Sequence, residues 1–112
     1  MRSVIVLFFL LLANASFGQL ISGRLIEDER KLLTTTTFIV QDTNEGVLFF
    51  ELAVNNLGNV TSAKLVNNGT TVVSTPTRIK VKNELVKWKF QEGTYYPEFH
   101  HVTVKITTKK GS

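Results

Sequence analysis

The stretch EGVLFFELAVNNLGNVTSAKLV, residues 45–66, decides the fold of this chain. Apolar side chains occupy every second position of its first half, namely Leu48, Phe50, Leu52 and Val54. This period-two pattern is typical of a strand with one face on a core. A short connection follows, in which Gly58 is free to take the positive φ of a tight hairpin turn, often with a bulge. Val60 restarts the extended chain, so we expect a β-hairpin.

The second face of this first strand also carries apolar side chains, Val47 and Phe49. Upstream, the segment Thr34–Gln41 (TTTTFIVQ) is rich in β-branched residues and is predicted to be extended. We expect this segment to cover the second face, or else a partner to contact it.

The segment from Thr75 to Phe90 carries two conflicting patterns. Thr75 and Pro76 are suited to the start of a helix, and Val81, Leu85 and Trp88 fall on one helical stripe. The same segment also alternates as a strand would, in RIKVK and VKWKF. Periodicity alone therefore leaves both structures open. The segment His101–Lys109 alternates without conflict and is predicted to be a strand.

Composition limits the possible classes of protein. The chain has 112 residues, which predicts a single domain, and it has no cysteine, which excludes disulfides and thiol chemistry. The net charge of +4 is uneven: residues 19–63 hold three basic and six acidic residues, and residues 64–112 hold nine and three. A basic half could favour nucleic acid, anionic lipid or an acidic protein surface, but we interpret it as a solvated surface that keeps a small domain soluble.

Residues 1–18 are predicted to be a secretory signal peptide. Arg2 precedes a run of ten apolar residues, and Ser16 and Gly18 are small residues at the −3 and −1 positions of a cleavage site. The run is shorter than the roughly 20 residues that span a bilayer. We therefore expect a periplasmic or secreted protein that begins near Gln19. Residues 19–33, with a mixed charge cluster at 27–31, are expected to form a solvent-facing N-terminal arm or a short helix.

No pattern of catalytic or ligand-binding chemistry stands out. His100 and His101 are adjacent and would point to opposite faces of a strand, which makes a poor metal site. There is no nucleophile elbow and no glycine-rich phosphate loop. The run KWKF at 87–90 alternates basic and aromatic residues, but core aromatics with solvated lysines explain it better than nucleic-acid binding. We predict no enzyme activity, metal, cofactor, nucleic acid or small-molecule substrate.

Several of these segments, in this order, resemble a known family. Gly46–Val47 opens an apolar strand, VNNLGNV follows at 54–60 and AKLV at 63–66, and a Trp-Lys-Phe step stands at 88–90. This order is similar to the C-terminal domain of TonB-type energy transducers, with Asn55 where the family usually has Asp. The asparagine-rich turns and the Gly-Gln junction resemble proteins of Bacteroidetes-type bacteria. The likeness covers roughly residues 34–108.

The resemblance implies an α+β domain over residues 34–112, with a β-β-α-β order. It implies an antiparallel sheet of three to four strands and one helix, from about Pro76 to Lys89, packed on one face. Val81, Leu85 and Trp88 would face the core. Ile79 and Val86 would lie on the opposite side of that helix, which does not suit a helix with one side buried and the other exposed to solvent. With a signal peptide in place of an anchor and only two prolines, the chain is expected to be a stand-alone, exported relative of the domain.

The resemblance also implies a binding role. In the family, the last strand offers its edge to an extended peptide of an outer-membrane transporter, which adds as a further strand. The matching residues are Val102, Thr103, Val104, Lys105, Ile106 and Thr107. Lys105 and the tail lysines would attract an acidic peptide. We therefore expect a protein partner, from an outer-membrane transporter or the envelope. The alternative is a structural envelope protein that pairs with itself as a homodimer.

Overall fold

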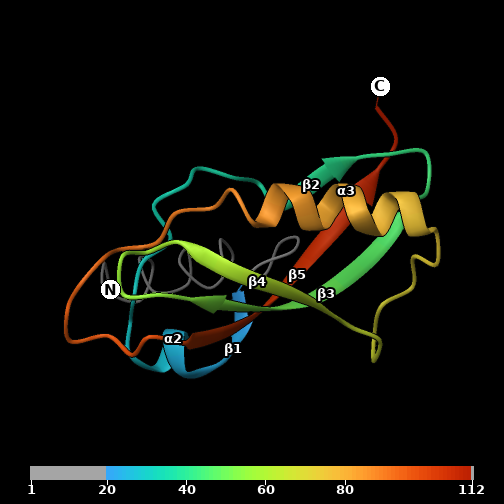
Figure 1. The fold of residues 1–112 in the computed structure, drawn as a ribbon. Coiled ribbons are helices and arrows are strands. Elements are labelled where there is room, and N and C mark those ends of the chain that lie inside the picture. The colour runs from blue at the N-terminus through green and yellow to red at the C-terminus, as the bar shows by residue number, and fades with distance from the viewer. Residues whose placement is uncertain (1–19, 112) are drawn as a thin grey trace, which may run out of the picture.

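In a computed structural model, the structure describes residues 20–111, so the predicted signal peptide and its cleavage site lie outside the described residues. Figure 1 shows the elements in chain order: β1 (Leu20–Ser22), α2 (Arg24–Glu27), β2 (Ile39–Gln41), β3 (Gly46–Val54), β4 (Val60–Val66), α3 (Thr75–Leu85) and β5 (His100–Lys109). Within residues 20–111, none of the helices has the length and apolar character that crossing a bilayer requires.

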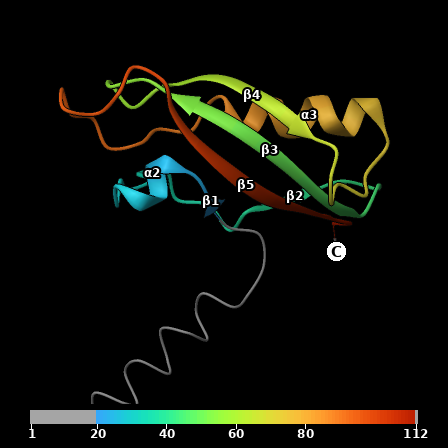
Figure 2. The same ribbon diagram turned by 90° about the horizontal axis from the view of Figure 1, so that it is seen from below.

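A single sheet joins the five strands in the order β1-β5-β3-β4, with β2 also paired to β5. β3 and β5 are antiparallel from the pair Gly46–Thr108 to the pair Val54–His100. β2 runs parallel to β5, and the other pairings are antiparallel. Figure 2 shows the order β4, β3, β5 across the sheet, with β1 and β2 beyond β5 and α3 near β4. The predicted α+β class is confirmed: residues 20–111 contain five strands rather than three or four, and the short helix α2 in addition to α3.

The core lies between the sheet and α3. The apolar side chains predicted for one face of the hairpin strand are all buried, with exposed fractions of 2% or less: Leu48, Phe50, Leu52 and Val54. From the helix side, Val81 and Leu85 pack into the same cluster, together with Trp88. The predicted helix stripe is therefore confirmed as the core-facing one.

The helix is shorter than predicted. α3 begins after Ser74, whose side-chain oxygen accepts a hydrogen bond from the backbone N–H of Thr77 at 3.4 Å, and it ends at Leu85 rather than Lys89. Phe90 forms an isolated bridge with Leu32, and it is fully buried. The alternating run at 78–82 is thus helical, and only Lys89 and Phe90, which form isolated bridges, follow the strand-like pattern.

The hairpin turn depends on Gly58. This residue has φ 88°, and its carbonyl accepts the backbone N–H of Phe90 at 2.8 Å. A Cβ at this position would lie 2.1 Å from the carbonyl oxygen of Phe90, so no other residue fits without a backbone shift. The Asn55 side chain accepts hydrogen bonds from the backbone N–H groups of Leu57 and Asn59. The predicted turn and its bulge, between Ala53 and Val54, are confirmed.

The segment before β3 is arranged differently from the prediction. Only Ile39–Gln41 forms a strand, and it extends the sheet beyond β5 instead of covering the second face of β3. Phe38 packs on the helix side, where its ring makes an edge-to-face contact with Trp88 at 5.4 Å between centroids. On the second face, Phe49 stays half-buried and contacts the turn at Gly69.

The predicted N-terminal arm is part of the domain. β1 pairs with β5, and Leu25 of α2 is fully buried in the core cluster. Arg30, in the charge cluster predicted to face solvent, is only 3% exposed. Residues 20–32 therefore contribute both a strand and core side chains.

We predict that Leu25→Ala lowers the free energy of unfolding by about 2–5 kcal/mol, because it removes a fully buried side chain and leaves a cavity. Leu33→Ala is the matched control, since Leu33 belongs to the same segment and is 58% exposed. The control should change stability by less than about 0.5 kcal/mol. Urea denaturation measures both variants, and equally small effects would contradict a structural role for this segment.

Candidate functional site

The six residues predicted to form a peptide-binding edge lie in β5, and their alternation is confirmed. Three are buried and three are half-buried: Val102, Val104 and Ile106, and Thr103, Lys105 and Thr107, respectively. The strand is not at an edge, however. β3 pairs along one side of it, while on the other side β1 pairs at 103–104 and β2 at 107–109. Only residues 105 and 106 lie between these two pairings, so the expected free edge is absent from the described structure.

The two histidines point to opposite faces, as their adjacency predicts: His100 is fully buried and His101 is exposed. The Nε2 atom of His100 lies 2.7 Å from a carboxylate oxygen of Asp28, and its Nδ1 lies 3.1 Å from Nη1 of Arg30. Because a guanidinium nitrogen can only donate, Nδ1 accepts this hydrogen bond. The ring is therefore neutral, with its proton on Nε2, where it donates to Asp28.

The guanidinium of Arg30 joins four segments of the chain. Its Nε donates to the carbonyl of Gln91 at 2.6 Å and its Nη2 to the carbonyl of Asn55 at 2.7 Å. Its central carbon lies 4.1 Å from the centroid of the Tyr96 ring. Burial lowers the pKa of Arg30, whereas the nearby Tyr96 hydroxyl raises it. An arginine side chain stays charged in proteins, so the cluster holds a buried cation in place.

This cluster has the features of a structural network rather than a reactive one. In residues 20–111, every buried side-chain nitrogen and oxygen has a hydrogen-bond partner. The same residues contain no group of three side chains able to hold a metal ion. The cluster also presents no serine, threonine or lysine as a nucleophile to His100.

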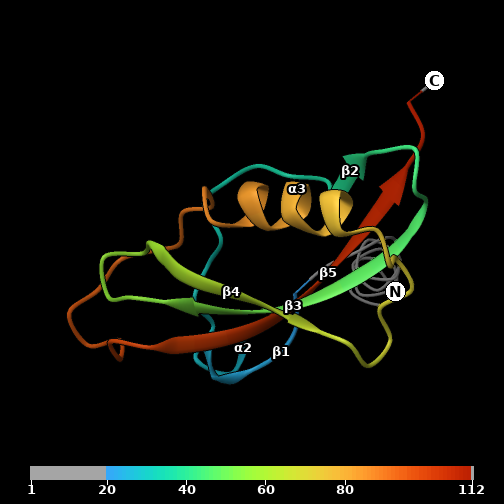
Figure 3. The same cartoon turned by 45° about the vertical axis from the view of Figure 1, so that its right-hand side comes forward.

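A groove runs between β4 and α3 and has a volume of about 560 Å³. Its floor is formed by Phe50, Ala63 and Leu65, and α3 contributes Ile79, which is 52% exposed. Figure 3 shows α3 lying over the β3–β4 side of the sheet, away from β1. An apolar floor beside a strand edge is suited to holding the side chains of an added strand.

β4 lies at the border of the sheet opposite β1. Among the described residues, no strand pairs with its outer side. Val47 directs its carbonyl toward Thr71, on the β4 side of β3. Backbone groups of every second residue point to the same side of a strand, so those of Glu51 also point toward β4. Glu51 pairs with Lys64, whose backbone groups therefore point toward β3. The N–H and C=O groups of the neighbours Ala63 and Leu65 consequently point outward.

Three cationic side chains surround the groove: Lys64, Arg78 and Lys82. No ion pair joins any of them to a carboxylate within residues 20–111, whereas Lys80 of the same helix lies 3.6 Å from Asp42. The Nε of Arg78 donates to the carbonyl of Val72 at 2.8 Å, which fixes this half-buried side chain at the groove.

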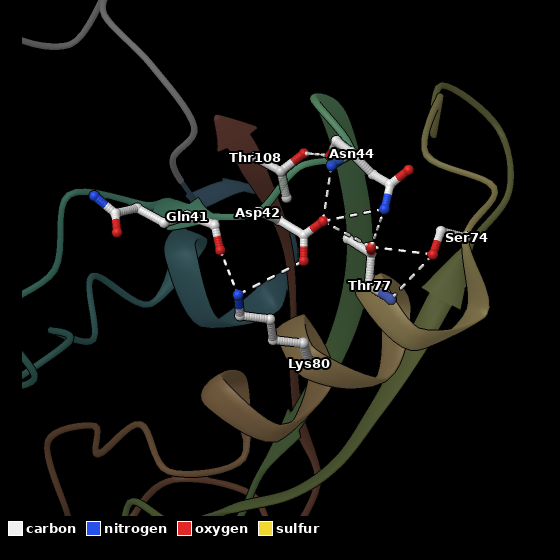
Figure 4. A network of polar contacts seen from close by, with 7 residues as sticks. All are labelled: Gln41, Asp42, Asn44, Ser74, Thr77, Lys80 and Thr108. Carbon is white, nitrogen blue, oxygen red and sulfur yellow. Dashed lines mark hydrogen bonds and ion pairs between the residues drawn. The ribbon is translucent and has the colours of Figure 1, made fainter. Parts of the chain in front are cut away.

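The groove has a fixed helix wall because the turn before β3 holds α3 (Figure 4). One carboxylate oxygen of Asp42 accepts the backbone N–H of Asn44 at 2.8 Å and the hydroxyl of Thr77 at 3.0 Å. Lys80, one turn further along α3, donates to the carbonyl of Gln41 and lies near the other carboxylate oxygen. These contacts join the first two turns of α3 to the sheet.

Sequence reasoning did not identify this groove, although one signal was present. Ile79 and Val86 did not fit the buried stripe of a helix with one exposed side. In the structure both are exposed, and Ile79 lines the groove. Unexplained apolar positions on an otherwise polar helix side were thus the signal for a second surface.

Comparisons of this chain with protein-family models, with curated proteins and with solved structures find no match.

We predict that the contacts of Asp42 make stability depend on pH. The hydrogen bond from the Asn44 N–H is the largest cause of the lowered pKa of Asp42; partial burial opposes it, and Thr77 and Lys80 add to it. A lowered pKa in the folded state gives stability that is present above the unfolded value of about 3.9 and is lost as pH falls through the folded value.

Asp42→Asn should therefore reduce the loss of stability between pH 5 and pH 2.5, measured by urea denaturation at a series of pH values. Glu98→Gln is the matched control, because this exposed carboxylate has no hydrogen-bond partner among the described residues. Identical pH profiles for wild type and Asp42→Asn would contradict the prediction.

Proposed function

We propose that this chain is an exported protein-binding module that takes up an extended segment of a protein partner by β-strand addition along β4. The observation that carries the proposal is the outward-pointing backbone of Ala63 and Leu65, next to a groove with an apolar floor. An added strand would form backbone hydrogen bonds with these groups, each contributing about 0.5–1.5 kcal/mol net. Its alternate side chains would enter the groove.

The resemblance to the TonB C-terminal domain supports the mode of binding but suggests a different strand. It points to β5, where β1 and β2 already pair in this chain. We therefore assign the same mode to β4, the border strand with no partner among the described residues. A segment of an outer-membrane transporter or of another envelope protein is the proposed partner.

Self-association is the second candidate. A border strand that accepts a peptide can also accept β4 of a second copy. The half-buried Val47 and Phe49 on the open face of the sheet would add apolar contact in such a dimer. Light scattering distinguishes the two: a strictly monomeric protein at high concentration would exclude the dimer.

We predict that Ala63→Pro weakens peptide binding about tenfold or more, because proline removes an outward N–H and places its ring at the border of the sheet. The fold should survive, since this N–H has no partner within residues 20–111. The probes are three labelled, blocked heptapeptides in which valine alternates with glutamate, glutamine or lysine, and fluorescence anisotropy measures their affinities.

Lys105→Pro is the matched control, because it alters β5 at the gap between β1 and β2. A second control uses two N-methylated forms of the tightest peptide, methylated at odd or at even positions. A strand that adds through one edge tolerates only one of the two forms. The proposal is overturned if no peptide binds, or if binding is lost in Lys105→Pro and kept in Ala63→Pro.

Export gives a separate prediction. When the full chain is produced in a Gram-negative bacterium, the protein recovered from the periplasm should begin at Gln19, as intact mass spectrometry would measure, because Ser16 and Gly18 form the cleavage pattern. Gly18→Leu is the control, since a bulky residue at the −1 position should block cleavage. Recovery of a chain that starts at Met1, in the cytoplasm only, would contradict export.

A further inference from the structure

We infer that the segment bound along β4 is acidic, with two carboxylates that stand two residues apart and face α3. This inference rests on the proposed function and names the chemistry of the partner. It follows from the charges around the groove, from their lack of internal partners and from the spacing between them.

The groove carries an excess of positive charge. Arg78 and Lys82 line its helix side, where none of the described lining residues is a carboxylate, whereas Lys64 lies on the open face with Glu51 as its cross-strand neighbour. Other lysines of this helical segment have acidic partners: Lys80 lies 3.6 Å from Asp42, and Lys87 lies 3.9 Å from Glu84. Arg78 and Lys82 are therefore available to an acidic ligand.

Arg78 is the most strongly positioned of the three. Its side chain is half-buried, and its Nε is held by the carbonyl of Val72 at 2.8 Å. The two terminal nitrogens have no partner among residues 20–111 and can form the paired hydrogen bonds that a carboxylate accepts. A fixed guanidinium loses little side-chain entropy when it binds such a group.

The spacing of the helix residues matches that of a strand. Arg78 and Lys82 are four positions apart, which is a rise of about 6 Å along a helix. Side chains on the same face of a strand repeat every two residues, or about 6.7 Å. Two carboxylates at alternate positions can thus reach both cations, while their aliphatic stems lie over Ala63 and Leu65. The intervening side chain falls on the open face, beside Lys64.

The three valine heptapeptides test this inference. At low salt, we expect the glutamate peptide to bind about tenfold more tightly than the glutamine peptide, through two exposed ion pairs, and the lysine peptide to bind most weakly. Raising the salt to 0.5 M should bring the glutamate and glutamine peptides close together, because exposed pairs are screened.

The variants locate the effect. Lys82→Gln and Arg78→Gln should each lower affinity for the glutamate peptide about threefold and leave the glutamine peptide unchanged. Lys87→Gln, which alters a lysine already paired with Glu84, is the matched control and should change neither affinity. Thermal unfolding checks that Arg78→Gln remains folded without its contact to Val72.

The outcomes separate this inference from the proposed function. If the three peptides bind equally well and Ala63→Pro abolishes their binding, strand addition stands and the acidic preference is wrong. Preference for the lysine peptide would also overturn the inference. Tighter binding of a single-stranded DNA oligonucleotide than of the glutamate peptide would overturn it too, since the groove would then select phosphates.

Discussion

The buried guanidinium of Arg30 is the constraint on which the rest of the structure depends. A charge that is 3% exposed must be satisfied by hydrogen bonds, because an unpaired buried ion is very costly. Here its partners come from the end of β3, the loop before β5 and His100. Asp28 accepts from the far side of that histidine, so a carboxylate balances the cation through a neutral ring. The residues after α2 are thereby fixed against β5.

Fixing this segment decides which side of the sheet stays open. Once Leu25 is buried and Arg30 is bonded, β1 lies beside β5, and the chain continues to β2 on the same side. The last strand thus becomes internal to the sheet. β4 remains the only border strand of substantial length among the described residues, and α3 lies over its side of the sheet. The binding surface is therefore a consequence of the N-terminal segment.

The sequence predicted the parts that depend on local periodicity. The alternation of β3 and β5, the turn at Gly58 and the stripe of Val81 and Leu85 follow from the positions of apolar residues and one glycine. The role of Arg30 could not be predicted, because a mixed charge cluster is usually solvated and its partners are 25 to 70 residues away. The groove depends on that tertiary arrangement and on Ile79, which appeared only as a misfit.

The charge of Lys64 links the protection of the border strand to its proposed use. An open strand invites pairing with a second copy, and a lysine on such a strand opposes it, because two antiparallel copies would bring their lysines onto neighbouring positions. The same repulsion is absent for an acidic segment. On the helix side of the groove, Arg78 and Lys82 attract its carboxylates. One set of cations can thus keep the chain from pairing with itself while favouring a partner of opposite charge.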